Sequence, residues 1–290
     1  MSVPDGGGAR GGGAPGSPAH DGGPLAGASR YLAGVGTHAT IAPDDLVPGA
    51  YILAIGGAEQ SHVDLADPEH VFYAYLRRIA NVLDLLMPPG EPLRVLHLGA
   101  GALTLARYVQ ARRPGSPQVA VELERELLGF VLDRLPLPPG TVLETRIGDA
   151  RWELASLASR APFDAIVLDV FSGPGAPSHL AHRDFYAEAA ALLAPGGAML
   201  VNIGDDPPLA LVRSQLAAMR TVFREVAALS EPEMFEARFP GNVIAVGLQS
   251  PWPEAWSAAL VAAGPYPTEL RRGVELDGLA GGGPADEGLG

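Results

Sequence analysis

The apolar residues between positions 94 and 223 fall into short runs that are separated by stretches with helical spacing. Runs typical of buried strands cover 94–98, 118–122, 142–147, 163–169 and 198–203. Helical patterns follow at 104–112, 125–135, 182–193 and 209–223, and a short helix is expected after residue 149. Strands and helices that alternate at such short intervals form a parallel sheet with right-handed crossovers. Two further apolar runs, 226–229 and 242–248, have no helix between them and are expected to pair as an antiparallel hairpin.

A smaller β-rich region is expected before this sheet. Residues 51–55 and 59–64 read as two strands, and the Gly-Gly pair between them allows a tight turn. The Asp-Pro pair at 67–68 is typical of a helix start, and apolar residues recur at helical spacing from there to Leu86. The sequence therefore predicts a β-hairpin and one helix ahead of the main domain.

Together these patterns predict an α/β protein with the methyltransferase-type variant of the Rossmann fold, a seven-stranded sheet that ends in an antiparallel hairpin. Gly, Ala, Pro and Ser dominate both ends of the chain, which bury too little to offset the entropy of ordering. We expect a disordered tail at 1–28, a small β-hairpin region with one helix at 29–90, a cofactor-binding domain at 91–250, and a C-terminal extension at 251–290 that is disordered from about 273.

The composition excludes some classes of protein but does not indicate which reaction the protein catalyses. The 290 residues are 47% hydrophobic, carry a net charge of -13 and include no cysteine. The acidic balance leaves no basic surface for nucleic acid and chiefly favours solubility, and the lack of cysteine excludes disulfides and fits a reducing compartment. No secretory signal or membrane-spanning stretch is visible, so we expect a cytoplasmic protein with neither a membrane nor a nucleic-acid partner. The seven histidines show no spacing typical of a metal site.

Small and acidic residues follow four successive predicted strands. Gly99 and Gly101 come after the first strand, Glu122 ends the second, Asp149 follows the third and Asp169 ends the fourth. Ligands of doubly wound sheets lie beyond the carboxyl ends of the strands. We therefore expect these residues to surround one binding site.

Each of these positions suits a part of a nucleoside ligand. A carboxylate at Glu122, 21 positions past Gly101, can accept hydrogen bonds from both ribose hydroxyls, and glycines let the backbone approach a ligand closely. Asp149, followed by Ala150, is placed to bind an adenine amino group, but an aspartate at a helix start is also a typical N-cap. Thr104 stands where a dinucleotide motif has its third glycine, which favours an S-adenosyl compound over NAD.

Several short motifs between residues 51 and 248 carry a family resemblance. They are Gly57-Ala-Glu-Gln60, Leu96-His-Leu-Gly-Ala-Gly101, Val121-Glu-Leu-Glu124, Gly148-Asp-Ala150, Phe163-Asp-Ala-Ile-Val-Leu-Asp169 and Ala194-Pro-Gly-Gly197. In this order and spacing they resemble the spermidine synthase family over about two-thirds of the chain. The hairpin motif and the Asp169 loop distinguish this family from other proteins with the same glycine loop.

The resemblance implies an aminopropyltransferase, which moves an aminopropyl group from decarboxylated S-adenosylmethionine to a small-molecule amine acceptor. The amine must be neutral when it attacks the carbon beside the sulfonium, and Asp169 matches the family's proton-accepting base. Gln60 matches a residue that contacts the nucleoside, and Glu122 and Asp149 match the ribose and adenine partners. The resemblance also implies a homodimer.

Three carboxylates of the family's pattern are absent from this chain. Gly56, Ala102 and Ser172 stand where the family has acids near the ammonium groups of its ligands. Each lost ion-pair acid costs about 1.5–3 kcal/mol of binding, so a doubly charged diamine would be held poorly. Tyr73 is either part of the acceptor pocket or helix core, and Asp205 either replaces a missing acid or caps the next helix. Ser172 is expected on the substrate side of the site.

Two other functions stay open at this point. A methyltransferase that uses intact S-adenosylmethionine is favoured by Ala102, because that part of the loop meets the tail of the cofactor. A non-catalytic homologue that binds a nucleoside is opposed by the retained Asp169, although a fold by itself does not fix a function.

Overall fold

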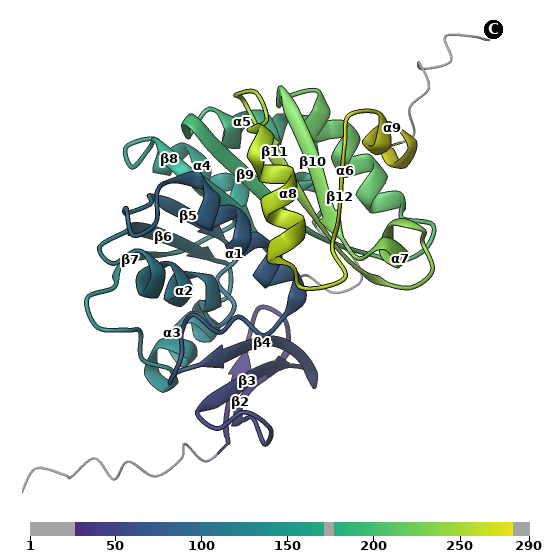
Figure 1. Cartoon of the computed structure of the whole chain (residues 1–290). Coiled ribbons are helices and arrows are strands. Elements are labelled where there is room, and N and C mark those ends of the chain that lie inside the picture. Colours follow the sequence, from purple (N-terminus) through teal and green to yellow (C-terminus); the bar gives the residue numbers. More distant parts are fainter. Residues whose placement is uncertain (1–26, 171–176, 281–290) are drawn as a thin grey trace, which may run out of the picture.

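The computed structural model describes residues 27–170 and 177–280, which form a large α/β domain and a small antiparallel sheet beneath it (Figure 1). The small sheet has the order β1 (Ala28–Leu32), β2 (Thr37–Pro43), β3 (Ala50–Ile55) and β4 (Ala58–Asp64). The predicted hairpin is confirmed as β3 and β4, which pair antiparallel. The strands β1 and β2 were not predicted, because alanine and threonine at their alternating positions leave only a weak apolar signal.

The first helix, α1 (Ala74–Leu86), begins later than the Asp-Pro pair indicated. Asp64 Oδ1 accepts hydrogen bonds from the backbone N–H groups of Ala66 and Asp67, and Asp67 Oδ1 accepts one from Glu69. These side chains stabilise a turn in place of the first helical turn, which is the local competition that aspartate offers to helix formation.

The large sheet confirms the methyltransferase-type Rossmann fold and adds an eighth strand to the seven that we expected. Its strands are β5 (Val95–Leu98), β6 (Pro117–Glu122), β7 (Val142–Ile147), β8 (Phe163–Leu168), β9 (Leu193–Asp205), β10 (Glu225–Ser230), β11 (Gly241–Leu248) and β12 (Glu269–Arg272). Their order is β12-β10-β11-β9-β8-β5-β6-β7. The pairs from β9 to β7 are parallel, and β9, β11, β10 and β12 pair antiparallel, as the hairpin prediction required.

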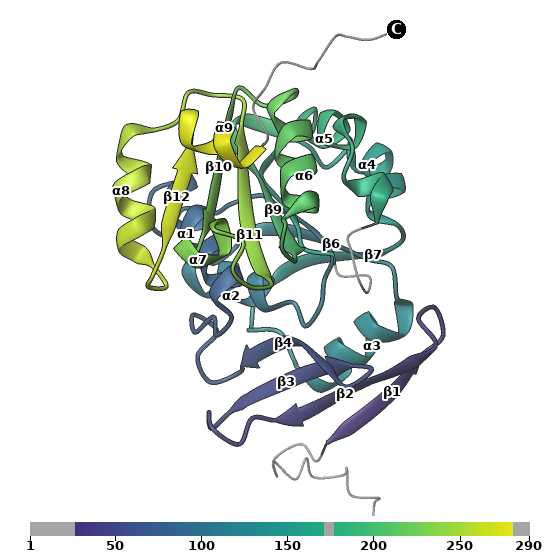
Figure 2. The same cartoon turned by 90° about the vertical axis from the view of Figure 1, so that its right-hand side faces the viewer.

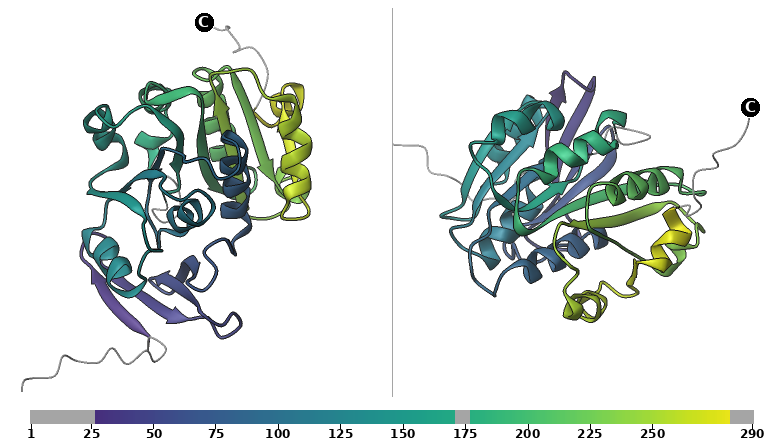
Figure 3. Two further views of the ribbon diagram at one scale, coloured as in Figure 1. Left: turned by 60° about the vertical axis from the view of Figure 1, so that its left-hand side comes forward. Right: turned by 90° about the horizontal axis from the view of Figure 1, so that it is seen from above.

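Helices cover both faces of this sheet (Figures 2 and 3). One apolar cluster packs α4 (Ala150–Leu157), α5 (Arg183–Ala190), α6 (Ala210–Arg220) and α9 (Val274–Ala280) against one face. A second packs α1, α2 (Thr104–Arg112) and α8 (Glu254–Ala263) against the other, and α3 (Arg125–Arg134) contacts the small sheet. Two short helices, η1 (Ser178–Leu180) and α7 (Pro232–Phe235), complete the described elements. None of the helices in the described residues is long and apolar enough to cross a membrane.

The strand β5 shows how alternation divides the core between the two faces. Leu96 and Leu98 belong to the cluster under α4, α5 and α6, whereas Val95 belongs to the cluster under α1 and α2. Side chains alternate along a strand, so His97 lies on the same face as Val95. Its side chain is 4% exposed.

The C-terminal extension carries more structure than the sequence predicted. The helix α9 continues to residue 280, beyond the point near 273 where we expected disorder to begin. Its Leu276 and Leu279, three positions apart, are buried in the cluster that α6 also lines. Two leucines at helical spacing bury enough apolar area to order a short helix on an existing core.

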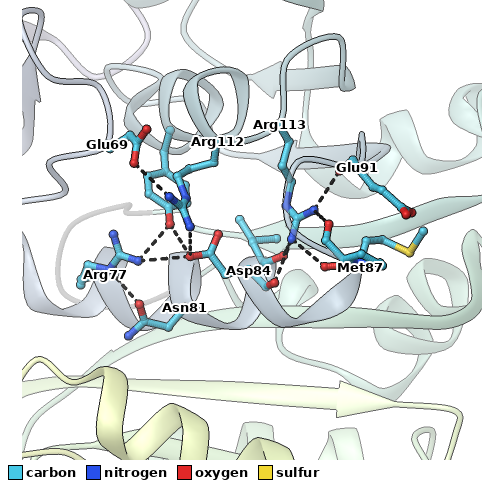
Figure 4. A network of polar contacts seen from close by, with 11 residues as sticks. Glu69, Arg77, Asn81, Asp84, Met87, Glu91, Arg112 and Arg113 are labelled. Carbon is cyan, nitrogen blue, oxygen red and sulfur yellow. Dashed lines mark hydrogen bonds and ion pairs between the residues drawn. The ribbon is translucent and has the colours of Figure 1, made fainter.

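A buried arginine, Arg113, fixes α1 against α2 (Figure 4). Arg113, just past the end of α2, donates hydrogen bonds to the carbonyl oxygens of Leu83, Asp84 and Met87 at 3.3, 2.8 and 2.9 Å. The last carbonyls of a helix have no intrahelical partner, so Arg113 satisfies the end of α1. The Asp84 carboxylate accepts a hydrogen bond from Tyr108 at 2.7 Å on the opposite side.

Truncation of a buried leucine tests whether α9 belongs to the core. We expect Leu276→Ala to lower the free energy of unfolding by about 2–5 kcal/mol, the usual cost of a buried cavity. Val274→Ala on the same helix is the matched control, because Val274 is 84% exposed and Leu276 is 1% exposed. Chemical denaturation of both variants measures the difference, and equal stabilities would contradict the packing described above.

Candidate active site

The glycine loop turns at the end of β5 and leads into α2. Gly99 and Gly101 have φ angles of +92° and +48°, a region that glycine enters without strain. A Cβ at Gly99 would lie 2.2 Å from the carbonyl oxygen of Asp169, and one at Gly101 would lie 2.8 Å from Ser61 Oγ. The two glycines are therefore required by close approach to other parts of the protein, which brings the loop beside Asp169 and beside β4.

Glu122 ends β6 and holds the same loop from the other side. Its Oε2 accepts a hydrogen bond from Ala100 N at 3.1 Å, and its Oε1 accepts one from Glu124 N at 3.0 Å. Each carboxylate oxygen has two lone pairs. Glu122 thus orients the loop and keeps acceptor capacity for a pair of hydroxyl groups.

Asp149 is the N-cap of α4, the alternative that the sequence left open. Its Oδ1 accepts hydrogen bonds from the backbone of Arg151 and Trp152 at 2.9 and 3.3 Å. Its Oδ2 lies 2.8 Å from His179 Nε2, a contact that the sequence did not indicate. Ala150, the first residue of the helix, is buried. An adenine amino group would have to share Oδ2 with His179.

Asp169 follows β8 directly and is held by a chain of two asparagines. Asn202 Nδ2 donates to Asp169 Oδ1 at 2.8 Å, and Asn242 Nδ2 donates to Asn202 Oδ1 at 3.0 Å. Burial raises the pKa of Asp169 above its ordinary value, and the hydrogen bond from Asn202 offsets part of that rise. A carboxyl group with a raised pKa suits the role of a general base.

Two stacked tyrosines lie at the start of α1, Tyr73 as its N-cap and Tyr75 within its first turn. Tyr73 and Tyr75 stack with ring centroids 6.0 Å apart, and the Tyr73 hydroxyl donates to Glu59 at 3.2 Å. Burial, followed by the charge of Glu59, raises the pKa of Tyr73 to about 12. Burial also raises the pKa of Tyr75, and the charge of Asp169 adds to that rise. The sequence had singled out Tyr73 alone, and Tyr75 was missed because it fits the helical apolar pattern equally well.

The other expected residues are placed as follows. Gln60 lies on β4, partly buried, next to Ser61, whose Oγ accepts a hydrogen bond from Ala102 N at 3.2 Å. Asp205 Oδ2 accepts a hydrogen bond from Val212 N at 2.9 Å, so it caps the first turn of α6. Ser172 lies outside the described residues.

A small cavity of about 30 Å³ lies between the glycine loop, β4 and Asp169. Its polar lining includes Ser61, His97, Thr104 and Asp169. Among the described residues, no group of three or more metal-binding side chains is present here or elsewhere. The arrangement brings the glycine loop, Ser61 of β4 and the Asp169 carboxyl group together at one cavity.

The comparisons with known proteins bear on the family and the fold of the chain. No family model matches the sequence. A polyamine aminopropyltransferase of Chromobacterium violaceum is 26% identical over 144 residues, which are 49% of this chain and 53% of that protein. The chain spans about half the length of the curated relatives that it matches.

Solved structures extend the similarity over most of the chain. A probable spermidine synthase from Corynebacterium glutamicum has a TM-score of 0.79 and 28% identity, and the match covers 90% of this chain and 95% of that one. Human methyltransferase-like protein 13 in complex with SAH has a TM-score of 0.51 and 24% identity, with coverage of 66% and 86%, which shows the fold alone.

The fold and the site together define an α/β protein with the methyltransferase-type Rossmann fold, whose relatives bear the names of transferases. Within this class the chain is similar to proteins named spermidine synthase and polyamine aminopropyltransferase, in agreement with the motifs of its sequence.

A methyl group added at Gly99 tests the close approach that organises the loop. We expect Gly99→Ala to cost more than about 2 kcal/mol of stability, because it combines an unfavourable φ with a clash against the backbone of Asp169. Gly115→Ala isolates the φ effect, since Gly115 has φ +80° and open space around its missing Cβ, and should cost about 1 kcal/mol. Equal losses in thermal unfolding would contradict the proposed clash.

The raised pKa of Asp169 makes the folded protein less stable at pH values where this carboxyl group is ionised. The folded protein binds this proton more tightly than the unfolded chain, so ionisation of Asp169 at neutral pH destabilises the fold. Asp169→Asn should therefore have a higher melting temperature than the natural protein at pH 7.5, and the difference should shrink as the pH falls through the pKa of Asp169. Asp133→Asn, at an exposed position, is the control. A difference that does not depend on pH would contradict this assignment.

Proposed function

We propose that this protein transfers an aminopropyl group from decarboxylated S-adenosylmethionine to a small-molecule amine acceptor. The observation that carries the proposal is the position of Asp169, a partly buried carboxyl group with a raised pKa at the edge of a nucleoside-type glycine loop. The names of the relatives, polyamine aminopropyltransferase and spermidine synthase, support the same reaction.

The residues of the site suit the parts of the donor. Glu122 is available to the ribose hydroxyls while it holds the loop, and Asp149 is available to the adenine amino group in competition with His179. The donor supplies an electrophilic carbon beside a sulfonium: the amine nitrogen forms a bond to that carbon, the carbon–sulfur bond breaks, and neutral methylthioadenosine leaves. Asp169 accepts the proton that the acceptor nitrogen loses.

The acceptor side of the site is more aromatic than acidic. Tyr73 and Tyr75 present stacked rings, and Glu59 lies at the outer end through its contact with Tyr73. Aromatic faces bind ammonium groups by cation–π attraction. These residues favour an amine acceptor that relies on one carboxylate near the reacting nitrogen.

Methyl transfer from intact S-adenosylmethionine is the second candidate, and Ala102 favours it. Ala102 is buried and its backbone N–H is bonded to Ser61, so the loop offers no acid to the tail of the donor. The products separate the two reactions, because aminopropyl transfer releases methylthioadenosine and methyl transfer releases S-adenosylhomocysteine.

Product analysis and binding together test the proposal. Purified protein with decarboxylated S-adenosylmethionine and a panel of mono- and diamines should release methylthioadenosine, detected by mass spectrometry. Glu122→Gln should weaken nucleoside binding about tenfold or more, because hydrogen bonds to a charged acceptor are the stronger ones, whereas Asp133→Asn removes the same charge without effect.

Three outcomes have different consequences. Release of S-adenosylhomocysteine from the intact donor would replace the proposal with methyl transfer. Binding of methylthioadenosine without turnover by any amine would indicate a nucleoside-binding homologue without this activity. If the decarboxylated donor, the intact donor and methylthioadenosine all fail to bind, the S-adenosyl assignment is wrong.

A further inference from the structure

His97 is a buried titratable residue to which the proposed reaction assigns no role. Its Nε2 lies 2.9 Å from Gln118 Oε1, and Gln118 Nε2 donates to the carbonyl of Ala106 at 3.1 Å. The second bond fixes the orientation of the amide, so its oxygen faces the histidine. An amide oxygen only accepts hydrogen bonds, and His97 must therefore carry its proton on Nε2 and a lone pair on Nδ1.

The ring of His97 lines the cavity beneath the glycine loop. Asp169, Ser61 and the glycines of the loop line the same cavity, and its volume of about 30 Å³ fits a group of the size of an amine or a water molecule. The Ser61 hydroxyl already accepts a hydrogen bond from the loop at Ala102. The Ser61 hydroxyl can still donate its own proton, whereas the Asp169 carboxylate and the unprotonated nitrogen of His97 are acceptors.

The charges of the residues that line the cavity determine whether it binds a cation or an anion. Burial lowers the pKa of His97 to about 4, so the ring is neutral at physiological pH and accepts a hydrogen bond without repelling a cation. Of the described residues that line the cavity, none is an arginine or a lysine. A carboxylate would meet Asp169 without any compensating positive charge.

We infer that this cavity receives the terminal ammonium of the donor's aminopropyl chain, and that His97 Nδ1 accepts one of its hydrogen bonds in place of the acid that is absent at position 102. The inference rests on the proposed function and adds a specificity-determining residue to it. It also gives a reason for a preference for the decarboxylated donor, because the α-carboxylate of the intact donor would be brought to a site without a cation.

The test compares three nucleosides by calorimetry: methylthioadenosine, which lacks the amine, the decarboxylated donor and the intact donor. The natural protein should bind the decarboxylated donor at least about tenfold more tightly than methylthioadenosine, as expected for a hydrogen-bonded charge. The double variant His97→Leu/Gln118→Leu removes both partners of the buried bond. The carbonyl of Ala106 loses the hydrogen bond from Gln118, but it lies inside α2, where the helix backbone supplies a donor. It should lose about tenfold in affinity for the decarboxylated donor and keep its affinity for methylthioadenosine.

A conservative variant and a measurement on the natural protein complete the test. His97→Asn keeps an acceptor near the position of Nδ1 and should retain most of the preference. In nitrogen NMR of the natural protein, the Nδ1 resonance of His97 should shift on addition of the decarboxylated donor and stay unchanged with methylthioadenosine. This measurement needs no substitution, so a folding defect cannot explain its result.

The outcomes distinguish this inference from the proposed function. An unchanged preference in the leucine variant, or an Nδ1 resonance that does not respond to the decarboxylated donor, would overturn the role of His97 while aminopropyl transfer stood. If methylthioadenosine does not bind to the natural protein, the proposed function fails first and the inference fails with it.

Discussion

The close approach of Gly99 to the backbone of Asp169 is the constraint on which the site depends. The strands β5 and β8 are parallel neighbours, with Leu98 opposite Leu168, so the next residue of each strand meets at the same edge of the sheet. A side chain at position 99 would occupy the space of the Asp169 carbonyl. Without one, the loop folds directly over the strand end, and a ligand held by the loop lies beside the carboxyl group that follows.

The small sheet and α1 close the remaining side of the site through polar contacts. Ser61 on β4 accepts a hydrogen bond from the loop, and the Thr104 hydroxyl at the start of α2 donates to the carbonyl of His62. Arg113 fixes the other end of α1 by satisfying its terminal carbonyls. The tyrosines at the start of α1 are therefore carried by a helix that is anchored on the large domain.

The sequence predicted the helices and strands that have a clear apolar period, and the site residues that directly follow a predicted strand. The order of strands and helices, the closing hairpin and the positions of Glu122 and Asp169 all follow from periodicity and from the meeting of strand ends at one edge. The elements with short or weak apolar patterns were missed: β1, β2, β12 and α9 each bury few side chains and are ordered by a core that other segments build.

The residues that sequence reasoning missed in the site are contacts between distant segments. Asn202 and Asn242 are polar positions inside otherwise apolar strands, and this is the signal that could have marked them. His97 gives a similar signal within β5, but its partner Gln118 is identified only when β6 lies beside it. The contact between His179 in η1 and Asp149 at the start of α4 joins two segments that no local pattern relates.

The titratable side chains of the site, Asp169 and His97, have neutral hydrogen-bond partners, and this determines the direction of their pKa shifts. Asn202 orients Asp169 without bringing a positive charge to it, so burial prevails and the pKa of the carboxyl group is raised. A lysine or an arginine in that position would hold the carboxyl ionised and make it a weaker proton acceptor. His97, held neutral by burial, likewise offers an acceptor without adding a charge. The site therefore has few charged groups, which weakens the binding of a doubly charged amine. The same lack of charged neighbours keeps the Asp169 carboxyl group basic enough to accept a proton from the reacting amine.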